Sequence, residues 1–97
     1  MKRNGLEIIA DILETIQNGN CSKSSIIKNA NLSVIQAKKY LQFLLNNKLI
    51  ITENSRYLIT EKGRKFIMQF RRIRQLEIEI YKNYEELTKM IYDEEKI

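Results

Sequence analysis

The sequence predicts a mostly α-helical chain with one small β-hairpin and a long helix at its C-terminal end. Apolar residues recur at helical spacing through the first half, and two short β-prone runs follow them, LIIT at 49–52 and YLIT at 57–60. No proline occurs anywhere, so nothing divides the last third of the chain. With 97 residues, the chain suits one small domain rather than two.

Three short helices are predicted before the hairpin. Their expected ranges are 6–18, 23–30 and 34–47. Ser22 and Ser33 are the expected N-caps of the second and third helices. Asn31 and Leu32 would form the tight turn between these two helices, which is typical of helix-turn-helix geometry.

The hairpin that follows supplies the remaining part of the fold. A hairpin directly after a helix-turn-helix is a wing, and the order helix, helix, helix, strand, strand is that of a winged-helix domain. Residues 53–56 are the expected loop, and Thr60 is the expected N-cap of the last helix. Gly63 costs that helix about 1 kcal/mol relative to alanine, and close packing against the hairpin would explain it. The predicted division is a winged-helix DNA-binding domain over 1–60 and a dimerisation helix over 61–97.

The terminal helix is too long to lie on a domain of this size. At about 1.5 Å per residue, some 36 residues extend roughly 54 Å. With Phe66 at heptad position a, an apolar stripe continues for about four heptads, which is typical of a coiled coil. The predicted dimerisation residues are Ile73, Leu76, Ile80, Asn83, Tyr84, Leu87, Met90 and Ile91. A helix that folds back on its own domain is the alternative.

Charge is distributed unevenly along the chain. Residues 1–76 carry a balance of +9 and residues 77–97 a balance of −4, within a total of +5. A basic body suggests an anionic partner. Arginines at 71, 72 and 74 and carboxylates at 93–95 lie at opposite ends of the terminal helix, which favours antiparallel over parallel pairing in a homodimer.

Several classes of function are disfavoured by composition. The chain has no histidine, a single cysteine (Cys21) and three widely separated glycines, so we expect no enzyme, no metal, no cofactor and no small-molecule substrate. Acidic residues at every third or fourth position of the N-terminal apolar run predict an amphipathic helix rather than a signal peptide. No apolar run is long enough for a bilayer, and we expect an intracellular protein without a membrane partner.

The chain resembles a known family in two runs, NLSVIQAKKYLQFLLNNKLI and RYLITEKGRKF, which precede the unbroken terminal helix. It is similar to the small archaeal winged-helix DNA-binding proteins that are described as chromatin or nucleoid-associated proteins. The most specific pieces are Leu32-Ser33, Lys39-Tyr40-Leu41 and the run from Ile59 to Gly63. The resemblance implies a homodimer that pairs through an antiparallel coiled coil and binds double-stranded DNA, in the cytoplasm and associated with the nucleoid.

If the third helix is the recognition helix, its first turns enter the major groove. Gln36 would pair with an adenine edge, and Val34 or Ile35 would touch a thymine methyl group. For Tyr40, a partly buried packing role is equally open. The other expected contacts, mainly to phosphates, are Lys23, Ser24, Lys28, Ser33, Lys38, Lys39 and Arg56. The alternative for each of these residues is a solvated surface side chain that contacts no DNA.

Three functions remain open at this point. The first is an architectural DNA-binding protein of low sequence specificity, the second a site-specific transcriptional regulator, and the third a protein-interaction module of a transcription assembly. The third helix has no arginine, the side chain best suited to bidentate guanine contacts, which favours the first.

Overall fold

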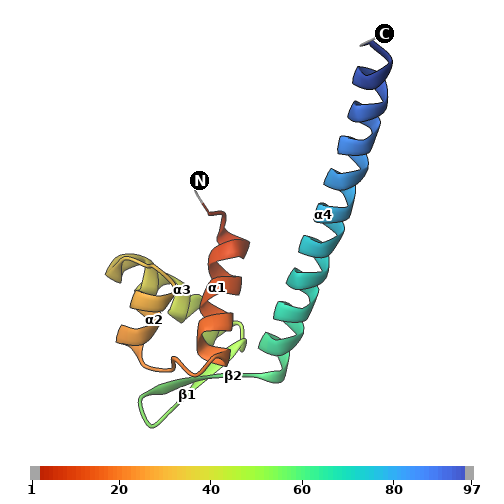
Figure 1. Cartoon of the computed structure of the whole chain (residues 1–97). Helices are drawn as coiled ribbons and strands as arrows, with labels where there is room; N and C mark the ends of the chain where they lie inside the picture. Colours follow the sequence, from red (N-terminus) through yellow and green to blue (C-terminus); the bar gives the residue numbers. More distant parts are fainter. Residues whose placement is uncertain (1–2, 96–97) are drawn as a thin grey trace.

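The computed structural model describes residues 3–95, and side chains as far as residue 92. Figure 1 shows the order of its elements: α1 (Gly5–Gln17), α2 (Lys23–Asn29), α3 (Val34–Asn46), β1 (Ile50–Glu53), β2 (Arg56–Ile59) and α4 (Glu61–Glu95). This order confirms the predicted fold class, a winged helix-turn-helix with a long C-terminal helix. The molecule is elongated, 67 × 26 × 21 Å, because α4 projects away from the other elements.

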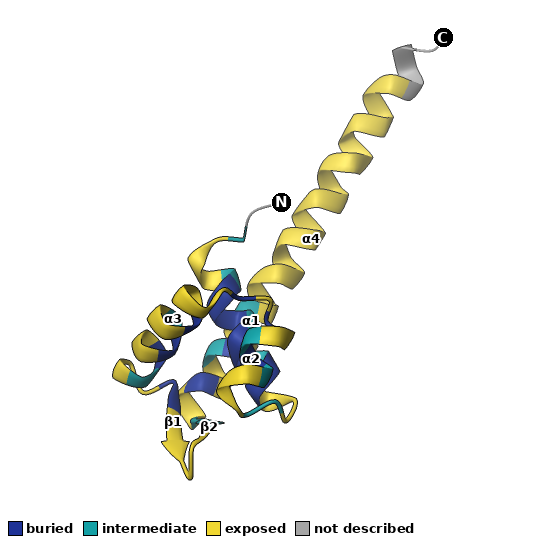
Figure 2. Ribbon diagram, turned by 90° about the vertical axis from the view of Figure 1, so that its left-hand side faces the viewer, coloured by how far each residue is buried: buried dark blue, intermediate teal, exposed yellow. Residues whose placement is uncertain are grey.

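One apolar core lies beneath the three short helices and the hairpin. Its fully buried members come from five of the six elements: Ile12 and Leu13 from α1, Ile26 from α2, Leu44 from α3, Ile50 from β1 and Ile67 from α4. The first turns of α4 therefore pack with the residues that precede it. From Arg71 to Tyr92, the last residue whose side chain is described, α4 is exposed (Figure 2).

The hairpin differs from the sequence prediction in its turn. The strands pair antiparallel, with Ile50 opposite Ile59 and Glu53 opposite Arg56, so the predicted four-residue loop over 53–56 was wrong. Only Asn54 and Ser55 form the turn, and both have positive φ, 52° and 63°. A two-residue turn of this kind fits the twist of the strands but usually contains glycine. Neither turn residue is glycine here, so the sequence did not predict a two-residue turn.

The junction between the hairpin and α4 is tightly packed. Thr60 caps α4: its Oγ1 accepts a hydrogen bond from the Gly63 backbone N–H (3.1 Å) and donates to the Lys48 carbonyl (2.7 Å). Gly63 is buried, and a Cβ built there would overlap the Leu49 carbonyl oxygen and lie 2.7 Å from Ile59 Cγ1. Both the predicted cap and the predicted close packing of Gly63 are confirmed.

Two ion pairs join α4 to α1. Arg71 Nε donates to Glu14 Oε1 at 3.2 Å, and Arg74 Nη2 donates to Glu7 Oε2 at 2.6 Å. The pKa of Glu7 lies below its usual value, because the backbone N–H of Asn4 donates to its carboxylate and Arg74 adds a second, charged donor. These exposed ion pairs add to the packing of α4 on the core, in which Ile67 is buried.

Candidate nucleic-acid interface

The turn between α2 and α3 is held from two sides. Asn31 has φ 54°, which reverses the chain, and the Leu32 N–H donates to the Ile27 carbonyl at 2.9 Å. From α1's side, Arg3 donates to Asp11 (2.7 Å) and to the carbonyls of Ala30 and Asn31 (2.8 Å each). The relative positions of the two helices are thus fixed by backbone hydrogen bonds and by a cation tied to α1.

Helix α3 turns one side to the core and the other to solvent. Ala37, Leu41 and Leu44 are buried. The opposite side, which we call the outer face of α3, consists of Ile35, Lys38, Lys39, Gln42 and Asn46. Apart from Lys38, these residues are spaced four, three and four apart, as one side of a helix requires. All five are exposed, so the outer face is free to meet a partner.

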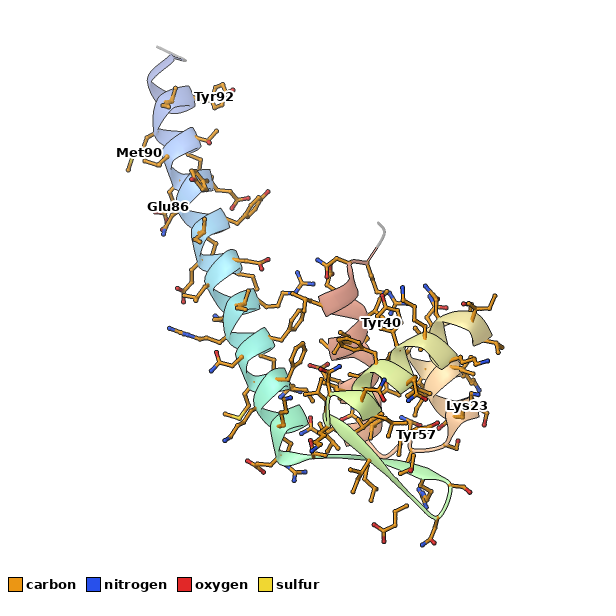
Figure 3. All side chains as sticks on the ribbon, turned by 180° about the vertical axis from the view of Figure 1, so that it is seen from behind. Lys23, Tyr40, Tyr57, Glu86, Met90 and Tyr92 are labelled. Atoms are coloured by element: carbon orange, nitrogen blue, oxygen red, sulfur yellow. The ribbon has the colours of Figure 1, made fainter. Side chains whose placement is uncertain are left out.

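The structure places most predicted contact residues at the surface of α2 and α3. Lys23, Ser24 and Lys28 are exposed on α2, and Figure 3 shows Lys23 on the side of the domain away from α4. Val34 is exposed in the first turn of α3, beside the outer face. Helices α2 and α3 pack against each other, so the exposed lysines of both belong to one part of the domain surface.

Arg56 lies apart from the helices, on the hairpin. It is exposed at the start of β2, directly after the turn, and its strand partner is Glu53. The hairpin is attached to the domain by Tyr57, whose backbone N–H donates to the Cys21 carbonyl at 2.9 Å. A contact from Arg56 to DNA would therefore come from a supported wing, but next to a carboxylate.

Three predicted contact residues have structural partners inside the chain. The Ser33 hydroxyl accepts from the Gln36 N–H, and the Gln36 side-chain oxygen accepts from the Ser33 N–H, both at 3.0 Å, in a capping box. Tyr40 is half-buried against the core and points towards α1, where its hydroxyl lies close to Gly5. Adenine reading by Gln36 would compete with the cap, and it stays a prediction.

Sequence reasoning missed two polar members of the outer face. Gln42 Nε2 donates to Asn46 Oδ1 at 2.9 Å, which leaves the Gln42 oxygen and the Asn46 amino group free for other partners. The signal was present in the sequence, since both residues follow Ile35 and Lys39 at helical spacing.

The charges around the outer face have one sign. Between Glu14 and Glu53 the chain has no acidic residue and five lysines. The α1 carboxylates Glu7 and Glu14 are engaged with α4. Within the described residues, no ion pair involves Lys23, Lys28, Lys38, Lys39 or Arg56. The positive potential over α2 and α3 is therefore not neutralised by the chain itself.

The predicted dimerisation residues lie exposed on α4. They are Ile73, Leu76, Ile80, Asn83, Tyr84, Leu87, Met90 and Ile91. Contiguous exposed apolar surface of this extent is rare on monomeric proteins. Arg71 and Arg74 form ion pairs with α1 of their own chain. Of the three arginines expected to favour antiparallel pairing, Arg72 is the one left for an ion pair with a second chain. The side chains at 93–95 lie outside the described part.

Three helices followed by an antiparallel hairpin define a winged helix-turn-helix fold. A family model described as winged helix-turn-helix matches residues 2–78, and the chain belongs to that family. Within the described residues, no helix is both long and apolar enough to cross a bilayer.

Three known proteins are similar to the chain. The crystal structure of Sso10a-2, a DNA-binding protein from Sulfolobus solfataricus, superimposes with a TM-score of 0.75 at 29% identity, over 91% of this chain and 96% of that one. Uncharacterized protein MJ0287 of Methanocaldococcus jannaschii is 36% identical over 64 residues, 66% of each chain. Uncharacterized protein MJ0290 of the same organism is 33% identical over 63 residues, 65% of this chain but 30% of its own length. The predicted resemblance to small archaeal winged-helix DNA-binding proteins is confirmed.

Proposed function

We propose that this protein is a homodimeric, architectural DNA-binding protein that contacts double-stranded DNA with low sequence specificity. The observation that carries the proposal is the acid-free segment between Glu14 and Glu53, which folds into a face with exposed lysines on both α2 and α3. The similarity to Sso10a-2, described as DNA-binding, supports the same partner. Binding of this kind needs no catalytic group or cofactor, and we place the protein with the nucleoid in the cytoplasm.

In the proposed complex, α3 enters the major groove with its outer face. Lys38 and Lys39 approach the phosphates on either side of the groove, and Lys23 and Lys28 of α2 contact the backbone beside it. Arg56 extends the contact to the wing. This arrangement neutralises several phosphates, so we expect the affinity to fall steeply as salt rises.

Low specificity follows from the side chains that the outer face lacks. It has no arginine, and the amide oxygen of Gln36 is committed to the capping box. Most of the binding free energy would then come from phosphates, which carry no sequence information. A site-specific regulator is the near alternative, and one dominant motif among duplexes selected by binding would favour it.

Replacing Lys38 and Lys39 by alanine together is expected to weaken binding to a random-sequence duplex by roughly tenfold at low salt. The slope of log K against log salt should also become shallower by about one for each phosphate that the variant no longer neutralises. The measurement is fluorescence anisotropy across a salt series. The matched control is Lys82→Ala with Lys89→Ala, which removes the same charge from the far half of α4, where both lysines are exposed.

If the Lys38/Lys39 variant and the α4 variant both bind the duplex as tightly as the wild type, the outer face of α3 is not the DNA-binding surface. If the Lys38/Lys39 variant kept its DNA affinity but lost capture of a protein partner, the protein-interaction module would be the better interpretation.

The homodimer is proposed from the exposed apolar stripe on α4. Two such helices paired antiparallel would bury both stripes and hold one winged-helix domain at each end of a shared rod. Arg72 near the start of α4 and the acidic residues of its second half would then come together between chains. Two separated domains would contact distant segments of one duplex or join two duplexes.

Spin labels on a single cysteine are expected to report the antiparallel orientation. With Cys21→Ser and Lys65→Cys, rods that overlap over most of their length separate the two labels by about 40–50 Å when antiparallel, and by less than about 25 Å when parallel. The distance is measured by pulsed electron paramagnetic resonance. A short distance would contradict the orientation, and the absence of any dipolar coupling at high protein concentration would contradict the dimer.

A further inference from the structure

Two exposed apolar side chains begin α3 and pack against nothing in the core. Ile35 is 82% exposed, the highest value among the exposed large apolar side chains of the described residues, and its neighbour Val34 is 67% exposed. Both are β-branched, and β-branched residues slightly disfavour a helix. Neither burial nor helix propensity therefore explains why they occur there.

The surroundings of this pair indicate its partner. Lys38 and Lys39 follow Ile35 after one helical turn, and Lys23 and Lys28 lie on the adjoining helix. No acidic residue occurs in this part of the sequence. An apolar protein surface would not complement such a cationic rim. The major groove does, since phosphates line its edges and its floor presents the C5-methyl groups of thymines.

We propose that Val34 and Ile35 read the C5-methyl groups of pyrimidines in the major groove, which gives the protein a preference for thymine-rich or 5-methylcytosine-containing duplexes. This inference rests on the proposed DNA-binding function and adds a chemical selectivity to it. In the first turn of α3, the oxygen of Gln36 accepts from the Ser33 N–H and Ser33 caps the helix, which leaves the Gln36 amino group as a donor. The exposed surface that this turn offers a base edge is otherwise apolar, from Val34 and Ile35.

The size of the preference follows from the area buried. One buried methyl or methylene group contributes about 0.8 kcal/mol, which corresponds to about fourfold in affinity. Each engaged domain should therefore distinguish a methylated from an unmethylated groove by roughly that factor. Such a preference biases the protein towards a composition without defining a single operator sequence.

The test compares duplexes that differ in the methyl group alone. Deoxyuridine in place of thymidine removes the C5-methyl and keeps every hydrogen-bonding group of the base pair. In a second, G·C-rich pair, 5-methylcytosine replaces cytosine and adds a methyl group at the same place. By fluorescence anisotropy at fixed salt, the wild-type protein is expected to bind the methylated member of each pair about fourfold more tightly per engaged domain.

Side-chain substitution assigns the effect to the pair. Val34→Ala with Ile35→Ala should bind methylated and unmethylated duplexes equally, and alanine at these exposed positions favours the helix. The matched control is Phe43→Ala, which removes an exposed apolar side chain from the side of α3 that faces Ile9 of α1, and it should keep the preference.

Each contrary outcome has a distinct meaning. If the wild type binds every duplex equally well, methyl reading is wrong while the proposed function stands. If no duplex is bound at all, the proposed function itself fails. If the Val34/Ile35 variant still prefers methylated duplexes, the preference arises from duplex shape and the assignment to these side chains is overturned.

Discussion

Gly63→Ala is expected to destabilise the protein by about 2 kcal/mol or more, although helix propensity alone predicts a gain of about 1 kcal/mol. Gly63 lies in the first turn of α4 and is buried, so its role is to leave space. An added Cβ would overlap the Leu49 carbonyl oxygen and approach Ile59 Cγ1 to 2.7 Å. A backbone oxygen cannot turn aside as a flexible side chain can, so either α4 or the hairpin must move.

The displacement reaches beyond the junction itself. Ile67 is 1% exposed and stands one helical turn after Gly63, so a shift of α4 also disturbs the core. For a chain of this size, a loss of 2 kcal/mol lowers the melting temperature by about 8–16 °C. Thermal unfolding followed by circular dichroism, at one protomer concentration for all variants, measures it.

Gly5→Ala is the matched control, because it makes the same change in the first turn of α1. There the new Cβ would lie 3.7 Å from the Tyr40 hydroxyl, an ordinary contact. Alanine at Gly5 is expected to leave stability unchanged or to raise it. Equal melting temperatures for the two variants would show that a Cβ at position 63 can be accommodated beside the hairpin without loss of stability.

The helices were predictable because each begins and ends with a local signal. Ser22 and Ser33 cap α2 and α3 as expected, and Gly19 follows α1 with φ 101°. The hairpin turn was harder to predict, because Asn54 and Ser55 both adopt positive φ although neither is glycine. Their conformation closes the pairing of Glu53 with Arg56, which residue propensity alone does not indicate.

The positive charge of the candidate interface was predictable from the sequence, but the hydrogen bonds and ion pairs of its side chains were not. Lys38 and Lys39 could be placed at the surface because they lie outside the buried stripe of α3, which is Ala37, Leu41 and Leu44. Whether a polar side chain is already engaged cannot be read from spacing. Arg71 and Arg74 looked available for a partner chain, yet they pair with Glu14 and Glu7, which lie about 60 residues away in the sequence.

Ile80→Lys is expected to weaken dimerisation by at least about a hundredfold. In the proposed dimer each chain would lose one buried isoleucine, and each loss removes about 1.5–3 kcal/mol of apolar burial, before the cost of placing a charge in the seam. The fold of the single chain should survive, because Ile80 is 55% exposed in it. Sedimentation equilibrium over a concentration series measures the change.

Ile78→Lys is the control that isolates the seam. The substitution is chemically identical, the starting residue is 50% exposed, and the position is two residues away, so it faces another side of α4. We expect this variant to remain a dimer.

Because both variants gain the same charge, any difference in their affinity for a long duplex reports the loss of the second binding domain, which lowers avidity by about a hundredfold or more. If both substitutions weaken the dimer equally, the heptad assignment is wrong; if neither does, the chains do not pair through α4.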